Sequence, residues 1–74
     1  MPDLSVPEFY VLTQLALAGG TLDRATIATL PTPMVGGVPG LVRRKLAGFD
    51  AAGERLGLTP AGEVIAEEAE EAVR

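Results

Sequence analysis

The side chains best suited to chemistry are three consecutive cations, Arg43, Arg44 and Lys45. At 100° per residue, Arg43 and Arg44 project from one side of a short helix, and Lys45 lies at the margin of its apolar side. Cationic groups gathered on one surface attract anionic partners. The alternative is that the three cations form a solvated helix face, as most surface charges do.

Catalysis needs residues that this sequence lacks. The chain has no histidine and no cysteine, so the usual general bases, strong nucleophiles and zinc ligands are missing. Ser5 is the only serine, and we expect it to cap a helix. We therefore expect no enzyme, no cofactor, no metal site and no disulfide.

Length and composition predict one small domain spanning residues 1–74. Six basic and ten acidic side chains give a net charge of −4, so the overall field repels nucleic acid. Hydrophobic residues make up 47% of the chain, which indicates apolar surface for a partner such as a second copy. The longest apolar run, residues 11–18, is far shorter than the ~20 residues of a membrane span. With no signal peptide at the start, we expect a cytoplasmic protein.

The first half of the chain predicts two helices. Ser5 and Glu8 are spaced as a capping box, and the first helix is expected to run to about Ala18 and end at Gly19-Gly20. It is apolar around most of its circumference, which fits either the central helix of the core or a helix with a second, dimer-forming face. The second helix is expected to start at Thr21 and to end before Pro31.

Residues 31–40 hold three prolines and three glycines, which predicts a turn rather than a long regular element. Gly36-Gly37 could instead form a nest of N–H groups that binds an anion. The third helix is expected to span residues 39–47, held from behind by Leu41, Val42 and Leu46 and stopped at Gly48.

Residues 49–58 fit a two-stranded ribbon with Ala52-Gly53 at its turn, and Phe49 and Ala51 on its first arm. A short helix capped by Asp50 is the alternative. After the ribbon, Thr59 and Pro60 make a helix start with almost no loop.

The last helix is predicted to span residues 60–73 and to be acidic. Its apolar face is expected to hold Ala61, Ile65, Ala69 and Ala72, with Val64 and Val73 beside it. Glutamates cover the remainder, namely Glu63, Glu67, Glu68, Glu70 and Glu71. Because these glutamates repel one another and oppose the helix dipole, we predict that the final turn frays. They are either a solvated face or a surface for a basic partner.

These elements predict a mostly helical α+β domain with three helices, a short β-hairpin and a C-terminal helix. The order resembles winged helix-turn-helix transcription regulators of the MarR, ArsR and PadR families. In those proteins the wing commonly returns into Leu-Thr-x-x-Gly, which stands here as residues 58–62. The resemblance implies that residues 39–47 are the recognition helix and residues 49–58 the wing. It further implies that Arg43 and Arg44 meet phosphates or guanine edges, and that Lys45 and Arg55 meet phosphates.

Two functions follow as expectations. The first is a small transcription regulator that binds duplex DNA as a homodimer, through its first and last helices. The second is a winged-helix-like module, such as an accessory or phage-type factor, that binds a protein and not DNA. The acidic balance favours the second, because Asp50 and Glu54 on the wing outnumber Arg55. Its contact surface would be the Glu67 to Glu71 face, the first helix or residues 31–40.

Overall fold

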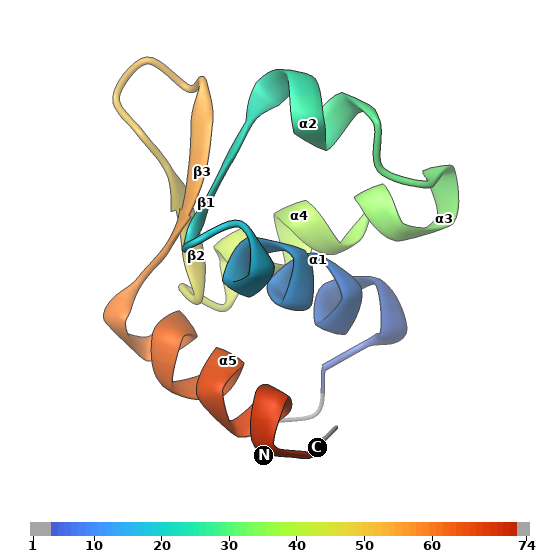
Figure 1. The fold of residues 1–74 in the computed structure, drawn as a ribbon. Helices are drawn as coiled ribbons and strands as arrows, with labels where there is room; N and C mark the ends of the chain where they lie inside the picture. The colour runs from blue at the N-terminus through green and yellow to red at the C-terminus, as the bar shows by residue number, and fades with distance from the viewer. Residues whose placement is uncertain (1–3, 73–74) are drawn as a thin grey trace.

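The computed structural model describes residues 4–72, which form a set of short helices and strands (Figure 1). In chain order they are α1 (Val6–Leu17), β1 (Thr21–Asp23), α2 (Arg24–Ala28), α3 (Thr32–Val35), α4 (Gly37–Arg43), β2 (Ala47–Phe49), β3 (Arg55–Leu58) and α5 (Pro60–Ala72). The three strands form one antiparallel sheet in the order β1-β3-β2. The chain is therefore a small α+β domain, mostly helical, with a C-terminal helix, as predicted. No helix within residues 4–72 is long and apolar enough to cross a membrane.

Helix α1 is the centre of the fold, and its start and end confirm the prediction. The Glu8 N–H donates to Ser5 Oγ at 3.3 Å, and the Ser5 N–H donates to Glu8 Oε1 at 2.9 Å, which completes the capping box. The helix ends at Gly19 and Gly20, whose φ angles of 85° and 105° suit glycine. In Figure 1, α1 lies between α5 on one side and α4 on the other.

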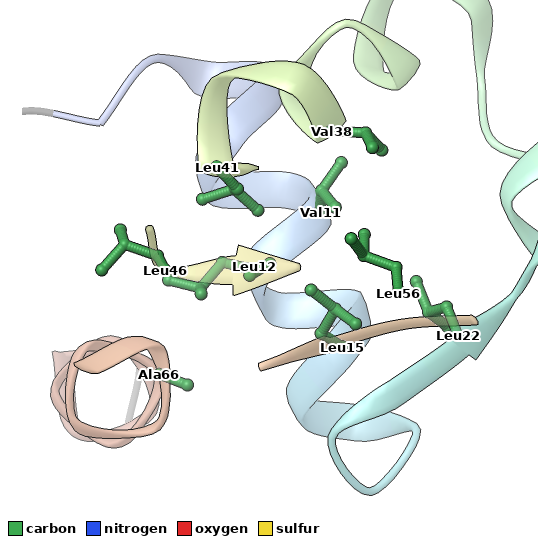
Figure 2. Packing of buried hydrophobic residues seen from close by; sticks show 10 residues of the cluster. Val11, Leu12, Leu15, Leu22, Val38, Leu41, Leu46, Leu56 and Ala66 are labelled. Carbon is green, nitrogen blue, oxygen red and sulfur yellow. The ribbon is translucent and has the colours of Figure 1, made fainter. Parts of the chain in front are cut away.

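The core of the domain surrounds α1, as Figure 2 shows. Val11, Leu12 and Leu15 of α1 are 0% exposed. Leucines from β1, α4 and β3 pack on them, together with Val38 and Ala66. Helix α1 is therefore the central helix of the core, and Val11, Leu12 and Leu15 are covered within a single copy of the chain.

The predicted second helix is wrong at its start, because Thr21 begins strand β1. Leu22 pairs with Leu56 of β3 and is buried, while its two neighbours are exposed. Asp23 then caps the shorter helix α2, accepting from the Thr26 N–H at 2.7 Å. Residues 21–23 form a strand because they pair with an edge of β3. Three residues are too few for an alternation of apolar and polar side chains to predict a strand from the sequence.

The segment predicted as a plain turn is largely helical. Pro33 lies in the first turn of α3 and Pro39 in the first turn of α4, where helical N–H groups have no intrahelical partner. Gly36 has an ordinary right-handed φ of −62°, and Gly37 lies inside the helix, so they do not form the alternating left-handed nest. Gly37 packs against the Pro7 backbone, and a Cβ there would overlap the Pro7 carbonyl oxygen.

The third predicted helix is also displaced. It begins at Gly37 rather than Pro39 and ends at Arg43 rather than Ala47. Gly48 does not stop it, because Gly48 is the middle residue of β2.

A hairpin forms as predicted and the alternative short helix is wrong. Its first strand is Ala47–Phe49, so the hairpin starts two residues earlier than predicted, and it is part of a three-stranded sheet rather than a separate ribbon. Ala47 faces Leu58 and Phe49 faces Leu56 across the hairpin. The Gly53 N–H donates to the Asp50 carbonyl at 3.0 Å, and Gly53 takes a φ of 69°, so the turn lies where Ala52-Gly53 predicted it. Ala51 lies in this turn and not on the first arm.

Helix α5 starts at Pro60 as predicted, but its buried face is rotated from the predicted one. Gly62, Ala66 and Ala69 are buried, whereas Ala61 is exposed and Val64 is 55% exposed. The side chain of Ala72, and Val73 with the fraying predicted for the final turn, lie outside the described residues.

Candidate nucleic-acid interface

The three consecutive cations lie at the end of α4, and Lys45 is outside the helix. Arg43 is the last helical residue, Arg44 is the C-cap, and Lys45 has a left-handed φ of 60°. The Lys45 N–H donates to the Val42 carbonyl and the Leu46 N–H to the Leu41 carbonyl, each at 3.0 Å. This is the Schellman pattern, in which the residue after the C-cap takes a left-handed conformation. All three cations are exposed, and Arg43 and Arg44 line one depression, to which Lys45 does not belong.

Arg44 is bound to a carboxylate of α1. Its Nε donates to Glu8 Oε2 at 2.7 Å, and the Glu8 residue is only 7% exposed. Hydrogen bonds from the Ser5 N–H, from Arg44 and from the Ser5 side chain hold the pKa of Glu8 at about 2, against an ordinary 4.5. Arg44 is therefore part of the contact between α1 and α4. Residue spacing does not reveal this pair, because 36 residues separate its members.

Gly40 makes room for the ion pair. A Cβ at Gly40 would lie 2.5 Å from Glu8 Oε2. Together with Gly37 at the Pro7 backbone, Gly40 lets α4 pack closely against the first turn of α1. These two glycines, predicted as loop residues, are packing residues.

The backbone of Lys45 is hydrogen-bonded to Thr59, the residue before α5. The Thr59 Oγ1 donates to the Lys45 carbonyl at 2.7 Å and accepts from the Gly62 N–H at 3.1 Å. The Thr59 N–H donates to the Leu46 carbonyl at 3.1 Å. Gly62 faces that carbonyl so closely that a Cβ would overlap it. The Leu-Thr-Pro-Ala-Gly segment therefore joins the end of α4 to α5, with Thr59 as the cap and Gly62 as the close contact.

Arg55 lies in the hairpin among carboxylates. It faces Asp23 across β1 and β3, and its N–H lies 3.4 Å from Asp50 Oδ1. Hydrogen bonds from Thr26 lower the pKa of Asp23, and the Glu54 N–H lowers that of Asp50, with a smaller contribution from Arg55 to each. The Arg55 side chain is exposed at the edge of this acidic group.

Arg24, at the start of α2, is a further cation near the hairpin turn, and the sequence pattern did not predict it. Its Nε donates to the Gly53 carbonyl at 3.1 Å, and its N–H donates to the Glu54 carbonyl at 2.8 Å. The start of α2 is thereby fixed to the hairpin turn, which projects from the sheet in Figure 1. An arginine at the first residue of a helix does not by itself indicate a contact with a distant hairpin, so the sequence does not predict this one.

Two open depressions lie near the cations. The first, of about 490 Å³, is polar and is lined by Ser5, Glu8, Gly36, Gly40, Arg43 and Arg44. The second, of about 510 Å³, is apolar and is lined by Arg44, Leu46, Ala61, Val64 and Ile65. We call the second depression the α5 groove. It was not foreseen, because Leu46 was predicted inside a helix and Ala61 at the core.

Within residues 4–72, no group of three or more acidic side chains is arranged to hold a metal ion. Comparison with protein-family models, with curated proteins and with solved structures finds no match to this chain. Function is therefore inferred from the fold and from the side chains described above.

Proposed function

We propose that this chain is a winged-helix domain that binds duplex DNA, with α4 as the recognition helix and the β2–β3 hairpin as the wing. The order of elements supports this proposal. Helices α2 and α4 are joined by the single turn of α3, and the hairpin begins directly after the Lys45 turn. A protruding hairpin beside an anchored helix is the arrangement that a groove of DNA can accept.

The observation that carries the proposal is the exposure of Arg43 at the end of α4. The opposite side of α4 is fixed, since Val38 and Leu41 are buried in the core. Arg43 therefore projects from a rigid support, and a guanidinium so placed contacts phosphate oxygens or the edge of a guanine.

Two arginines near the hairpin turn, one of α2 and one of β3, add phosphate contacts. Arg55 and Arg24 are both exposed near the hairpin turn. Arg44 contributes less in this proposal because it binds Glu8, and Lys45 because it lies at the junction with α5. The neighbouring carboxylates Asp23, Asp50 and Glu54 weaken attraction to DNA, which makes binding by a single copy weak.

Three phosphate contacts per copy predict a slope of about −3 when the logarithm of the affinity is plotted against that of salt concentration. Replacing Arg43 and Arg55 together by alanine should change this slope to about −1, because two counterion-releasing contacts are lost. The measurement is a salt titration of binding to mixed-sequence duplex DNA.

Arg74→Ala is the matched control, since it removes one positive charge from the far end of the sequence. It should leave the slope unchanged. Absence of duplex binding by the native chain at low salt would reject the proposal, and so would an unchanged slope in the double variant.

The second candidate function is a protein-binding module. The α5 groove favours it, because Val64 is 55% exposed next to Leu46 and Ile65. The charges around the hairpin turn point the same way, because three carboxylates lie there against two arginines, namely Asp23, Asp50 and Glu54 against Arg24 and Arg55. A pull-down from the native lysate that recovers nucleic acid but no protein would count against this candidate.

A further inference from the structure

Helix α1 carries an exposed apolar face on the side away from the core. At 100° per residue, this face lies opposite the α1 side chains that are fully buried. Val6 is 70% exposed at one end of the face and Leu17 is 78% exposed at the other. Tyr10 and Thr13 lie between them and are half-buried. We call these four residues the outer face of α1.

No charge interrupts the outer face. From Phe9 to Gly20 the chain holds no charged residue. The Thr13 hydroxyl donates to the Tyr10 carbonyl at 2.7 Å, so this polar group is already hydrogen-bonded within the helix. A helix face that stays in water usually carries charged and polar side chains. Because apolar surface gains free energy when it is covered, this face is suited to a partner.

The spacing of the outer face fits a helix as that partner. Its positions follow one another by four, three and four residues, which is the repeat by which one helix packs along another. The stripe runs over about three turns, or about 16 Å.

Glutamates of α5 border the outer face. In Figure 1, α5 runs beside α1 in the opposite direction. A depression of about 200 Å³ lies beside both helices and is lined by Ala16 of α1 and by Glu63, Glu67 and Glu70 of α5. All three glutamates are exposed. Ala16 lies about 60° from Thr13 around α1, so the depression adjoins one edge of the outer face.

These glutamates set the charge of the partner. They follow one another at four and three residues along α5, so they are neighbours that repel. Within residues 4–72, no lysine or arginine forms an ion pair with any of them. A cationic row on a partner removes this repulsion, whereas the phosphates of DNA add to it. A second copy is also disfavoured, because the described surface holds no lysine or arginine to set against its own glutamates.

We propose that the outer face of α1, together with the glutamates beside it, binds a basic amphipathic helix of another protein. The apolar side of that helix covers the outer face. Its lysines or arginines, placed along one flank, meet Glu63, Glu67 and Glu70. This surface lies apart from Arg43, the hairpin and the α5 groove, so the contact is separate from both functions proposed above.

The probe is a synthetic peptide of about 18 residues, made of leucine and lysine with the leucines at helical spacing. A scrambled peptide of the same composition keeps the charge without the apolar side, and a leucine–glutamate helix keeps the apolar side with the opposite charge. By fluorescence anisotropy, the native chain should bind the leucine–lysine helix at least about tenfold more tightly than either control. This binding should weaken as salt rises.

The apolar contact is tested at Leu17. Leu17→Gln should raise the dissociation constant about tenfold, because it removes an exposed aliphatic side chain from the contact. Val64→Gln is the matched control. Val64 is also an exposed aliphatic residue, but it lines the α5 groove, so its replacement should leave the affinity unchanged.

The charged contact is tested on α5. Glu63→Gln combined with Glu70→Gln should raise the dissociation constant about fivefold and reduce its dependence on salt. Glu54→Gln combined with Glu68→Gln removes the same charge outside the depression and should change the constant by less than about twofold. Circular dichroism confirms that each variant is folded.

A native chain that does not bind the leucine–lysine helix at low salt would overturn this proposal. Equal binding of the scrambled peptide, or equal losses in Leu17→Gln and Val64→Gln, would overturn it by showing attraction that does not use the outer face. A dimer in analytical ultracentrifugation that Leu17→Gln abolishes would also overturn it, by assigning the face to a second copy. None of these results affects the salt titration with DNA, which depends on other residues.

Discussion

Glu8 connects the start of α1 to the end of α4 through one carboxylate. Its Oε1 caps the start of α1 and its Oε2 binds Arg44 at the end of α4, while Gly40 provides the space between the helices. A carboxylate with this little exposure is stable as an anion only because charged and polar donors surround it. Replacing the charge therefore affects the whole contact between α1 and α4.

Glu8→Gln should lower the free energy of unfolding by about 2 kcal/mol at neutral pH, because hydrogen bonds to a charged group are worth about that much. Urea unfolding followed by circular dichroism measures it. Glu67→Gln, on the exposed side of α5, is the control and should change stability by less than about 0.5 kcal/mol. Equal effects of the two substitutions would contradict the structural role of Glu8.

The native chain and Glu8→Gln should also differ in how their stability depends on pH. The folded pKa of Glu8, about 2, lies below its ordinary value of 4.5, so the unfolded chain binds the proton more readily. The contribution of Glu8 is therefore complete above about pH 4.5 and is lost as the pH falls towards 2. The difference in unfolding free energy between the native chain and Glu8→Gln should shrink over that range. Asp23 and Asp50, whose pKa values are also lowered, are present in both proteins and do not affect the difference.

Helix α4 is held by a close contact at its start and by a cap at its end. At the start, a Cβ at Gly37 would overlap the Pro7 carbonyl, whereas a Cβ at the adjacent Gly36 meets open space. The helix ends because Lys45 adopts a left-handed backbone conformation, which is unfavourable for any residue with a side chain.

Gly37→Ala should destabilise the domain by about 3 kcal/mol, because the two helices must move apart to accept the methyl group. Gly36→Ala is the matched control. Its φ of −62° suits alanine, so it should raise stability by about 0.5 kcal/mol through the unfolded chain. Thermal and urea unfolding of both variants would show opposite signs, and loss of similar size in both would contradict the close packing at Gly37.

Lys45→Gly should raise stability by about 1 kcal/mol, because glycine takes the left-handed conformation without the steric cost of a Cβ. Lys45→Ala keeps that cost and removes the same charge, so it should give no gain. Urea unfolding of the three proteins distinguishes release of strain from loss of charge. A gain in Lys45→Ala equal to that in Lys45→Gly would assign the effect to the charge.

At the scale of the whole molecule, a chain of 74 residues has a small core and marginal stability. The described core is one cluster around α1, and the chain has no cysteine to reinforce it with a disulfide.

Local signals in the sequence were enough for elements whose ends are fixed by neighbouring residues. Ser5 and Glu8 are three residues apart, Gly19 and Gly20 follow the helix that they end, and Thr59 caps the helix that begins one residue later. The hairpin belongs to the same class, because its turn joins strands that are adjacent in the chain. These elements were predicted correctly for that reason.

These short-range elements can be read from the sequence alone, as can the lack of histidine and cysteine that removes most catalytic chemistry. Only the folded chain shows that residues 21–23 form a strand and that Arg44 binds Glu8. Each of these two features depends on a partner far along the chain, namely the edge of β3 and the first turn of α1. Residue spacing encodes contacts within a few positions, whereas contacts between distant segments exist only once the chain has folded.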